Sequence, residues 1–233
     1  MLYIYSGDVP ELNDRLVEQL GKKYIITTIP ANPSDMASAK HVTDSFRHAG
    51  LRTRLCSARF YRDPRRLHQI IMNSDAVYLT GGNTFEFLDY AYHTGLFEML
   101  REFEAGDGVI LGDSAGSIIL SPNIATALIP TTCPDEHNIE MDSYVGMGRI
   151  PFHISPHFEP DADVAQNELD ELQALAYVSK IPVKVLQDGE GFIMAGEAII
   201  HTVGNPIDLA PDIAPDPKLN TADLLPDWAS ILS

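Results

Sequence analysis

Residues 108–120 read Gly-Val-Ile-Leu-Gly-Asp-Ser-Ala-Gly-Ser-Ile-Ile-Leu, a pattern that indicates a buried strand followed by a helix. The apolar run Gly108–Leu111 is typical of a buried strand, and the apolar residues after the last glycine favour a helix. Between them, Gly112–Gly116 has the G-x-S-x-G spacing of a nucleophile elbow, a sharp strand-to-helix turn that projects a serine from the end of a strand. An ordinary glycine-rich turn can have the same spacing. The position between strand and helix nevertheless makes Ser114 a candidate nucleophile, with the Ala115 N–H as a candidate oxyanion donor.

The chain on either side of the elbow alternates between short β-branched runs and helical patterns. This order predicts an α/β fold with a mostly parallel central sheet, covered by helices on both faces. The 233 residues fit one domain over residues 1–233. The expected strands are 2–5, 24–29, 52–56, 76–80, 108–111, 183–187, 191–194 and 198–203, and the expected helices are 10–20, 34–50, one beginning at 63–64, 84–92, 96–103 and 161–178.

Two segments have no regular pattern. Residues 121–150 are rich in Pro, Thr and Met and form a long excursion, for which a role as a lid is left open. The tail from Asn205 carries five prolines and is expected to be an irregular strap.

The composition excludes several classes of protein. Asp and Glu number 33 against 16 Lys and Arg, a formal net charge of −17, which argues against a nucleic-acid partner because such binding depends on basic residues. The first residues read as a strand rather than a signal peptide, and no run approaches the ~18 apolar residues of a membrane span. We therefore expect a cytoplasmic protein. Cys56 and Cys133 match neither a disulfide scaffold nor a metal-binding spacing, and Cys56 is expected to be buried.

A second glycine-containing loop follows the strand expected at residues 76–80. Residues 80–85 read Thr-Gly-Gly-Asn-Thr-Phe, which is neither a Walker loop nor a dinucleotide-binding G-x-G-x-x-G. Glycines let backbone N–H groups face a ligand. The Gly82 N–H is therefore a candidate second oxyanion donor, while Asn83 is a candidate substrate contact or a helix cap.

Four motifs in this order resemble the peptidase E family of α-aspartyl dipeptidases and their relatives, to which cyanophycinase is more distantly related. The motifs are residues 80–85, Gly112–Gly116, Ser-Pro-His-Phe at 155–158 and Leu-Gln-Asp-Gly at 186–189. The resemblance implies a three-layer α/β sandwich similar to class I glutamine amidotransferases. It also implies a serine peptidase that cleaves dipeptides or short peptides without a metal or other cofactor.

The resemblance also implies roles for individual residues. Ser114 would be the nucleophile, His157 its base and Asp188 the third member of the triad, with Gly82 and Ala115 as oxyanion donors. Independently, a serine hydroxyl needs a base to become a good nucleophile, and His157 lies on an expected loop, where site residues gather.

The acid of the triad has an alternative. Asp188 closes an expected strand but can also be a simple turn aspartate before glycine. Glu190 therefore remains a second candidate.

Rival functions use other residues. An esterase of the α/β-hydrolase class would use Ser114, Asp188 and His201 in that chain order, although His201 sits in an apolar strand pattern that favours a packed side chain. A catalytically inactive, peptide-binding relative is the non-enzymatic alternative. Monomer and homodimer both remain open.

A metal site is a further alternative. His153 and His157 are four residues apart and have Asp161 and Asp163 nearby, but Pro156 would break the helix that this spacing needs. We therefore expect no metal.

The charges near His157 bear on the substrate. A buried substrate carboxylate is usually bound by arginine, and residues 151–233 contain none. Glu159–Asp163 adds acidic residues. We therefore do not expect the preference for an N-terminal aspartate, and a cationic N-terminus could be favoured, unless Arg149 or an arginine of residues 47–66 reaches the site.

Overall fold

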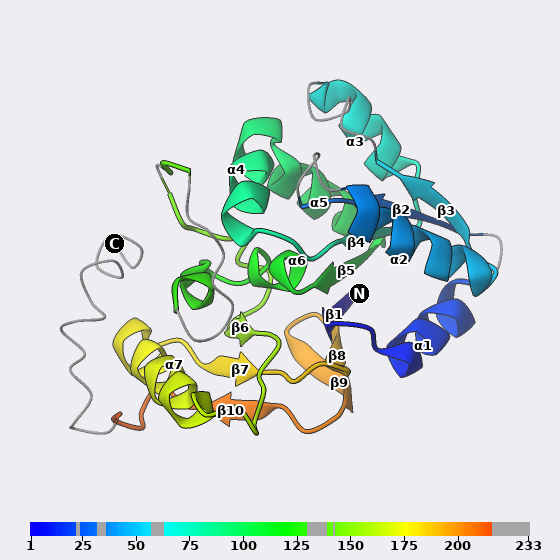
Figure 1. The fold of residues 1–233 in the computed structure, drawn as a ribbon. Coiled ribbons are helices and arrows are strands. Elements are labelled where there is room, and N and C mark those ends of the chain that lie inside the picture. The colour runs from blue at the N-terminus through cyan, green and yellow to red at the C-terminus, as the bar shows by residue number, and fades with distance from the viewer. Residues whose placement is uncertain (22–23, 32–35, 57–62, 130–138, 142, 216–233) are drawn as a thin grey trace.

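The computed structural model describes residues 1–21, 24–31, 36–56, 63–129, 139–141 and 143–215 (Figure 1). A seven-stranded sheet with the order β3-β2-β4-β5-β1-β8-β9 forms its centre. The strands from β3 to β1 pair in parallel, whereas β8 is antiparallel to both β1 and β9. The strands are β1 (Leu2–Ser6), β2 (Ile25–Ile29), β3 (Arg52–Leu55), β4 (Ala76–Leu79), β5 (Val109–Asp113), β8 (Glu190–Ala195) and β9 (Ala198–Val203).

Helices cover both faces of this sheet because its strands are apolar on both sides. In β1, Leu2 and Ile4 join one core cluster, and Tyr3 and Tyr5 join the cluster on the opposite face. The tyrosine face packs on α1 (Pro10–Leu20) and α2 (Met36–His48). The opposite face packs on α3 (Pro64–Met72), α4 (Thr84–Thr94), α5 (Leu96–Ala105) and α6 (Ala115–Ile118). The predicted three-layer α/β architecture is confirmed.

A smaller sheet lies at the lower left of Figure 1, beside β8 and β9 of the central sheet. It has the order β10-β7-β6, with β6 (His153–Ser155) parallel and β10 (Ile207–Leu209) antiparallel to β7 (Val183–Val185). Helix α7 (Ala165–Ser179) packs on this sheet through a third core cluster. This arrangement places the chain segments that follow β6 and β7 beside the carboxyl ends of β1 and β5.

The structure corrects three of the expected elements. The tail contains a short strand, β10, and is not an irregular strap throughout, and β6 forms in a segment for which no strand is expected. Helix α7 begins at Ala165 rather than at Asp161, because residues 160–164 form turns instead, with Ala162 N–H donating to Glu159 O and Ala165 N–H to Ala162 O.

Part of the 121–150 excursion packs back on the elbow region. The 3₁₀ turn η2 (Ala125–Leu128) lies in it, and Met147 N–H donates to Ile119 O at 2.7 Å. Residues 130–138 and 142 fall outside the described part, and so does Cys133, whereas Cys56 is buried as expected.

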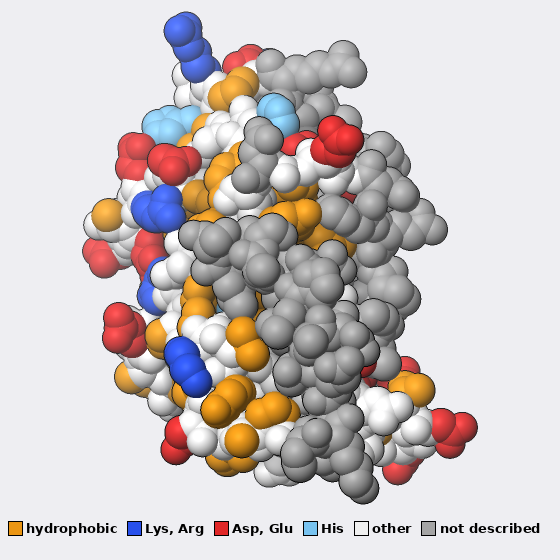
Figure 2. All heavy atoms as spheres, turned by 90° about the vertical axis from the view of Figure 1, so that its left-hand side faces the viewer, with side chains coloured by type: hydrophobic (Ala, Val, Ile, Leu, Met, Phe, Trp, Pro, Cys, Tyr) orange, Lys and Arg blue, Asp and Glu red, His pale blue; other side chains and the backbone are white. Residues whose placement is uncertain are grey.

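Apolar side chains gather on one side of the molecule. Figure 2 looks onto the side of Figure 1 on which α7 lies, and it shows these apolar side chains along the middle, with acidic and basic side chains around them. Among the described helices, none combines the length and the apolar character that crossing a membrane requires.

Candidate active site

Ser114 occupies a strained turn between β5 and α6. Its backbone has φ 51° and ψ −117°, a conformation that L-residues rarely adopt. The turn brings helix and strand into close contact, since a Cβ on Gly116 would lie 2.2 Å from Leu79 O and one on Gly112 2.7 Å from Gly116 O. Glycine is therefore required at both positions, as a nucleophile elbow demands.

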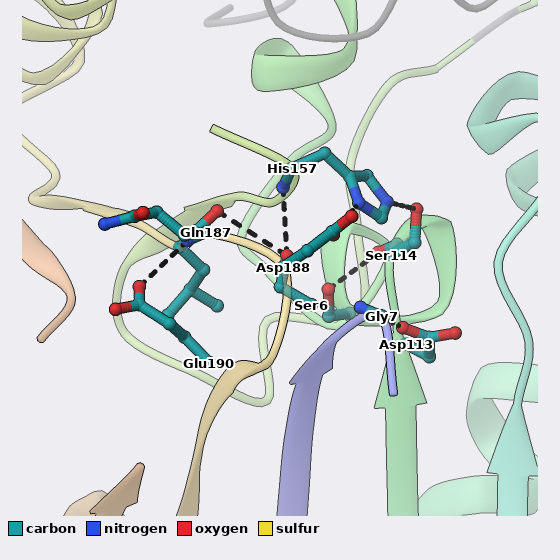
Figure 3. A network of polar contacts seen from close by, with 10 residues as sticks. Ser6, Gly7, Asp113, Ser114, His157, Gln187, Asp188 and Glu190 are labelled. Carbon is teal, nitrogen blue, oxygen red and sulfur yellow. Dashed lines mark hydrogen bonds and ion pairs between the residues drawn. The ribbon is translucent and has the colours of Figure 1, made fainter. Parts of the chain in front are cut away.

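His157 lies against the hydroxyl of this serine. Its Nε2 is 2.7 Å from Ser114 Oγ, and its Nδ1 is 2.5 Å from Asp188 Oδ1 (Figure 3). The hydroxyl is thus placed to donate to Nε2 while Nδ1–H donates to the carboxylate. His157 has φ 63°, and its backbone N–H donates to Ser6 Oγ at 2.9 Å. The structure therefore brings Ser114, His157 and Asp188 together in the order that serine hydrolases use.

Both carboxylate oxygens of Glu190, the second candidate acid, accept hydrogen bonds from backbone N–H groups. Its Oε2 accepts from Gln187 N–H at 2.8 Å and its Oε1 from Asn205 N–H at 2.7 Å, and the residue is buried. Figure 3 shows its side chain directed away from His157. Glu190 therefore braces the turn that carries Asp188 and does not contact the imidazole.

The other candidate histidines lie elsewhere. His201, on β9, forms a contact of 2.8 Å with Glu11 of α1, so the structure does not bring it to Ser114. His153 is fully buried on β6, and burial lowers its pKa to about 4. Within the described residues, no three His, Cys, Asp or Glu side chains are grouped so that they could hold a metal ion.

Two backbone N–H groups are candidates for the oxyanion. Ala115 begins α6, and Gly82, at φ 137°, precedes α4. Neither N–H donates to an acceptor among the residues that the structure describes. Asn83 is the N-cap of α4, since its Oδ1 accepts from Glu86 N–H at 3.0 Å, so this oxygen is already used in the cap.

Asp113 is an ionisable residue next to the candidate nucleophile Ser114. The sequence patterns did not single it out. Burial raises the pKa of its carboxyl to about 6, partly offset by a hydrogen bond with the Tyr78 hydroxyl. Its Oδ1 accepts from Gly7 N–H at 3.0 Å. The G-x-S-x-G pattern leaves the second position open, so only the acidic residue type itself could have drawn attention to it.

A cavity of about 420 Å³ adjoins the triad on the side of Asp188. Phe158, Glu159, Asp161 and Gln187 line it together with Asp188. Arg149, one of the arginines that could have supplied positive charge, instead pairs with Glu104 at 2.7 Å. The described surroundings of this cavity are therefore acidic.

Comparisons with known proteins identify a peptidase family that matches this chain. The family model described as "Peptidase family S51" matches residues 3–202. An uncharacterized peptidase of Listeria monocytogenes is 28% identical over 56% of this chain and 61% of its own length. Proteins named Peptidase E from Streptomyces coelicolor and Shewanella amazonensis are 29% and 33% identical, over 54% and 60% of this chain and 51% and 57% of their own lengths. The chain thus spans about half the length of the curated relatives it matches.

Solved structures share the fold. A Listeria monocytogenes protein provisionally named Peptidase E has a TM-score of 0.70 at 22% identity, covering 87% of this chain and 96% of that one. A peptidase from an acI-B1 actinobacterium has a TM-score of 0.57 at 16% identity, covering 88% and 95%. The first likeness supports the predicted similarity to the class I glutamine amidotransferase fold.

Proposed function

The chain belongs to peptidase family S51, and from this premise we propose that it is a serine-type peptidase that hydrolyses dipeptides or short peptides through an acyl-enzyme. The predicted resemblance to peptidase E is confirmed by the family match and by the relatives of that name. One observation carries the proposal. The Ser114 hydroxyl, on a strained elbow, lies 2.7 Å from the imidazole Nε2 of His157, whose other nitrogen contacts Asp188.

The first half-reaction forms the acyl-enzyme. Ser114 Oγ attacks the peptide carbonyl carbon while His157 Nε2 accepts the hydroxyl proton, and the carbonyl oxygen becomes an oxyanion. The Gly82 and Ala115 N–H groups would stabilise this negative charge. Neither N–H donates to another acceptor among the described residues, so no hydrogen bond has to break first. His157 then protonates the leaving amine, so that the C–N bond breaks and Ser114 remains esterified.

The second half-reaction uses water. His157 takes a proton from a water molecule, which attacks the ester carbonyl, and the acid product leaves as the proton returns to Ser114. Asp188 holds the imidazole with Nδ1 protonated throughout and stabilises the imidazolium that forms. Its side chain is 73% exposed, so water reaches this end of the triad.

The test combines covalent labelling with turnover of a dipeptide panel. A serine-directed fluorophosphonate should label the protein at Ser114, and Ser114→Ala should abolish labelling and lower kcat by on the order of 10⁶ without changing the circular-dichroism spectrum. His157→Ala should be nearly as damaging, whereas the matched control His201→Ala should leave turnover close to that of the unmodified chain. Full turnover in Ser114→Ala would end the proposal, and a dead His201→Ala with an active His157→Ala would favour the α/β-hydrolase alternative.

A further inference from the structure

A second cavity, of about 300 Å³, lies between α1 and α2 on the tyrosine face of the sheet. Tyr5 of β1 and Tyr78 of β4, whose ring centroids are 6.0 Å apart, line it together with Asp113 at the end of β5. Asp8 before α1, Asn13 of α1 and His41 of α2 line it as well. The triad chemistry described above uses none of these side chains.

This cavity lies within reach of the nucleophile. A Cβ built on Gly81 would lie 3.6 Å from Ser114 Oγ and 3.7 Å from Asp113 Oδ2. Ser114 Oγ and Asp113 Oδ2, the latter on a residue that lines the cavity, are therefore no farther apart than the sum of these distances. A long side chain attached to a residue whose carbonyl is at Ser114 can span that separation.

The cavity holds buried oxygen atoms that can accept a hydrogen bond and have no partner within the described residues. The Tyr5 hydroxyl is buried and Asn13 Oδ1 is buried as well, and neither has a hydrogen-bond partner within the described residues. Asn13 Nδ2 is already used, since it donates to Asp8 Oδ1 at 3.1 Å. Neither lysine nor arginine occurs among the described residues that line the cavity. Buried acceptors without donors are costly, so a ligand rich in N–H groups would satisfy them.

We propose that this cavity is a specificity pocket for a cationic side chain, an ammonium or guanidinium group, on the residue at the acyl side of the scissile bond. The inference rests on the proposed peptidase function and names its substrate class. The cation would pair with Asp113, while Tyr5 and Asn13 accept its remaining hydrogens. An acidic side chain would instead face the carboxylates of Asp8 and Asp113.

The ionisation of Asp113 agrees with this assignment. Burial raises the pKa of this carboxyl to about 6, and the Tyr78 hydroxyl, His157 and the Gly7 N–H only partly offset that effect. A bound ammonium would supply that charge in a partly desolvated site, where charge-assisted hydrogen bonds are strong.

The experiment compares kcat/KM for Lys-Leu and norleucyl-Leu, which have side chains of similar length with and without a charge. The unmodified chain should prefer Lys-Leu by roughly 10- to 100-fold, the size expected for a paired charge. Asp113→Asn, which retains an oxygen for the Gly7 N–H, should bring the ratio close to one. Asp14→Asn is the matched control, since it removes the same charge from an exposed position of α1 that does not line the cavity, and it should leave the ratio unchanged.

A second variant, Tyr5→Phe, tests the proposal independently in case Asp113→Asn does not fold. Tyr5→Phe keeps the ring and removes only the hydroxyl without a partner, and it should lower the ratio part of the way. If peptides are cleaved but Lys-Leu is no better than norleucyl-Leu, or if Asp113→Asn keeps the full ratio, the specificity pocket is overturned and the peptidase proposal stands. If no peptide is cleaved and Ser114 takes no fluorophosphonate, the peptidase proposal fails and the pocket assignment fails with it.

Discussion

Ser114 and His157 are both held at positive φ, and β1 supplies an anchor for each of them. The Ser114 N–H donates to Tyr5 O at 3.2 Å, and the His157 N–H donates to Ser6 Oγ at 2.9 Å. A residue held in such a conformation costs on the order of 1–3 kcal/mol, so it persists only when its surroundings fix it. Two adjacent residues of the first strand thus help to set the spacing between the candidate nucleophile and its base.

Single substitutions can test whether Asp188 or Glu190 is the acid of the proposed triad. Asp188→Asn should lower kcat by about 10⁴, because an amide no longer favours the imidazole tautomer with Nδ1 protonated. Glu190→Gln should change kcat little but destabilise the fold by roughly 1–3 kcal/mol, because an amide group cannot accept from both backbone N–H groups that the carboxylate binds. Steady-state kinetics and denaturant unfolding separate the two effects. The opposite ranking in kcat would transfer the acid role to Glu190.

Asp113 should make the stability of the fold depend on pH. Burial raises its pKa from 3.8 to about 6, so the neutral form is favoured in the folded state. The resulting stabilisation is fully present below pH ~4 and is lost as pH rises through ~6, a difference on the order of 3 kcal/mol. Asp113→Asn removes this titration. It should unfold at the same denaturant concentration as the unmodified chain near pH 4 and at a higher one near pH 8; equal midpoints at pH 8 would show that the carboxylate is well solvated.

At the scale of elements, local signals predicted most of the central fold. The expected helix 10–20 has the observed bounds of α1, and Asp63 caps α3 as the Asp-Pro pair indicates. In contrast, β6 and β10 have three residues each and are strands because both pair with β7. Such pairing is a tertiary effect that local β-propensity does not report.

Like the fold, the candidate site could be predicted from the sequence only in part. Ser114, His157 and Asp188 follow strand ends within recognisable motifs, so their proximity could be expected. The support that Ser6 gives to His157 and the cavity beside Asp113 could not, because both depend on contacts between residues about a hundred or more positions apart. Sequence patterns thus indicated the candidate reacting groups and left their surroundings open.

Two helix N-caps form a matched pair, Asn83 before α4 and Asp63 before α3. Asn83→Ala and Asp63→Ala each remove an N-cap acceptor and should each lower the free energy of unfolding by about 1 kcal/mol. Only Asn83→Ala should also lower kcat/KM, because Asn83 follows Gly82, the candidate oxyanion donor. Unfolding curves and kcat/KM for one dipeptide measure both effects. If Asn83→Ala keeps the full kcat/KM, Asn83 acts only as the N-cap of α4.

At the scale of the whole molecule, two electrostatic effects act on a charged substrate. The formal net charge of −17 creates a long-range field, which salt screens over about 10 Å at 0.1 M and 3 Å at 1 M. The acidic groups around Ser114 act at contact distance, where salt screens them much less. Varying the ionic strength therefore distinguishes the long-range effect of the net charge from the short-range effect of the acidic groups near Ser114.

This separation yields a prediction for acidic substrates. At low ionic strength, kcat/KM for Asp-Leu should be lower than for Ala-Leu, because both the net charge and the carboxylates of Asp8 and Asp113 oppose it. Raising the salt to about 0.5 M should narrow the gap without closing it, since the contact repulsion remains. Ala-Leu, which has no side-chain charge, controls for effects of salt on the chemistry. A preference for Asp-Leu of about a hundredfold, equivalent to about 2.7 kcal/mol, would contradict the acidic character of the site and would require an arginine near it.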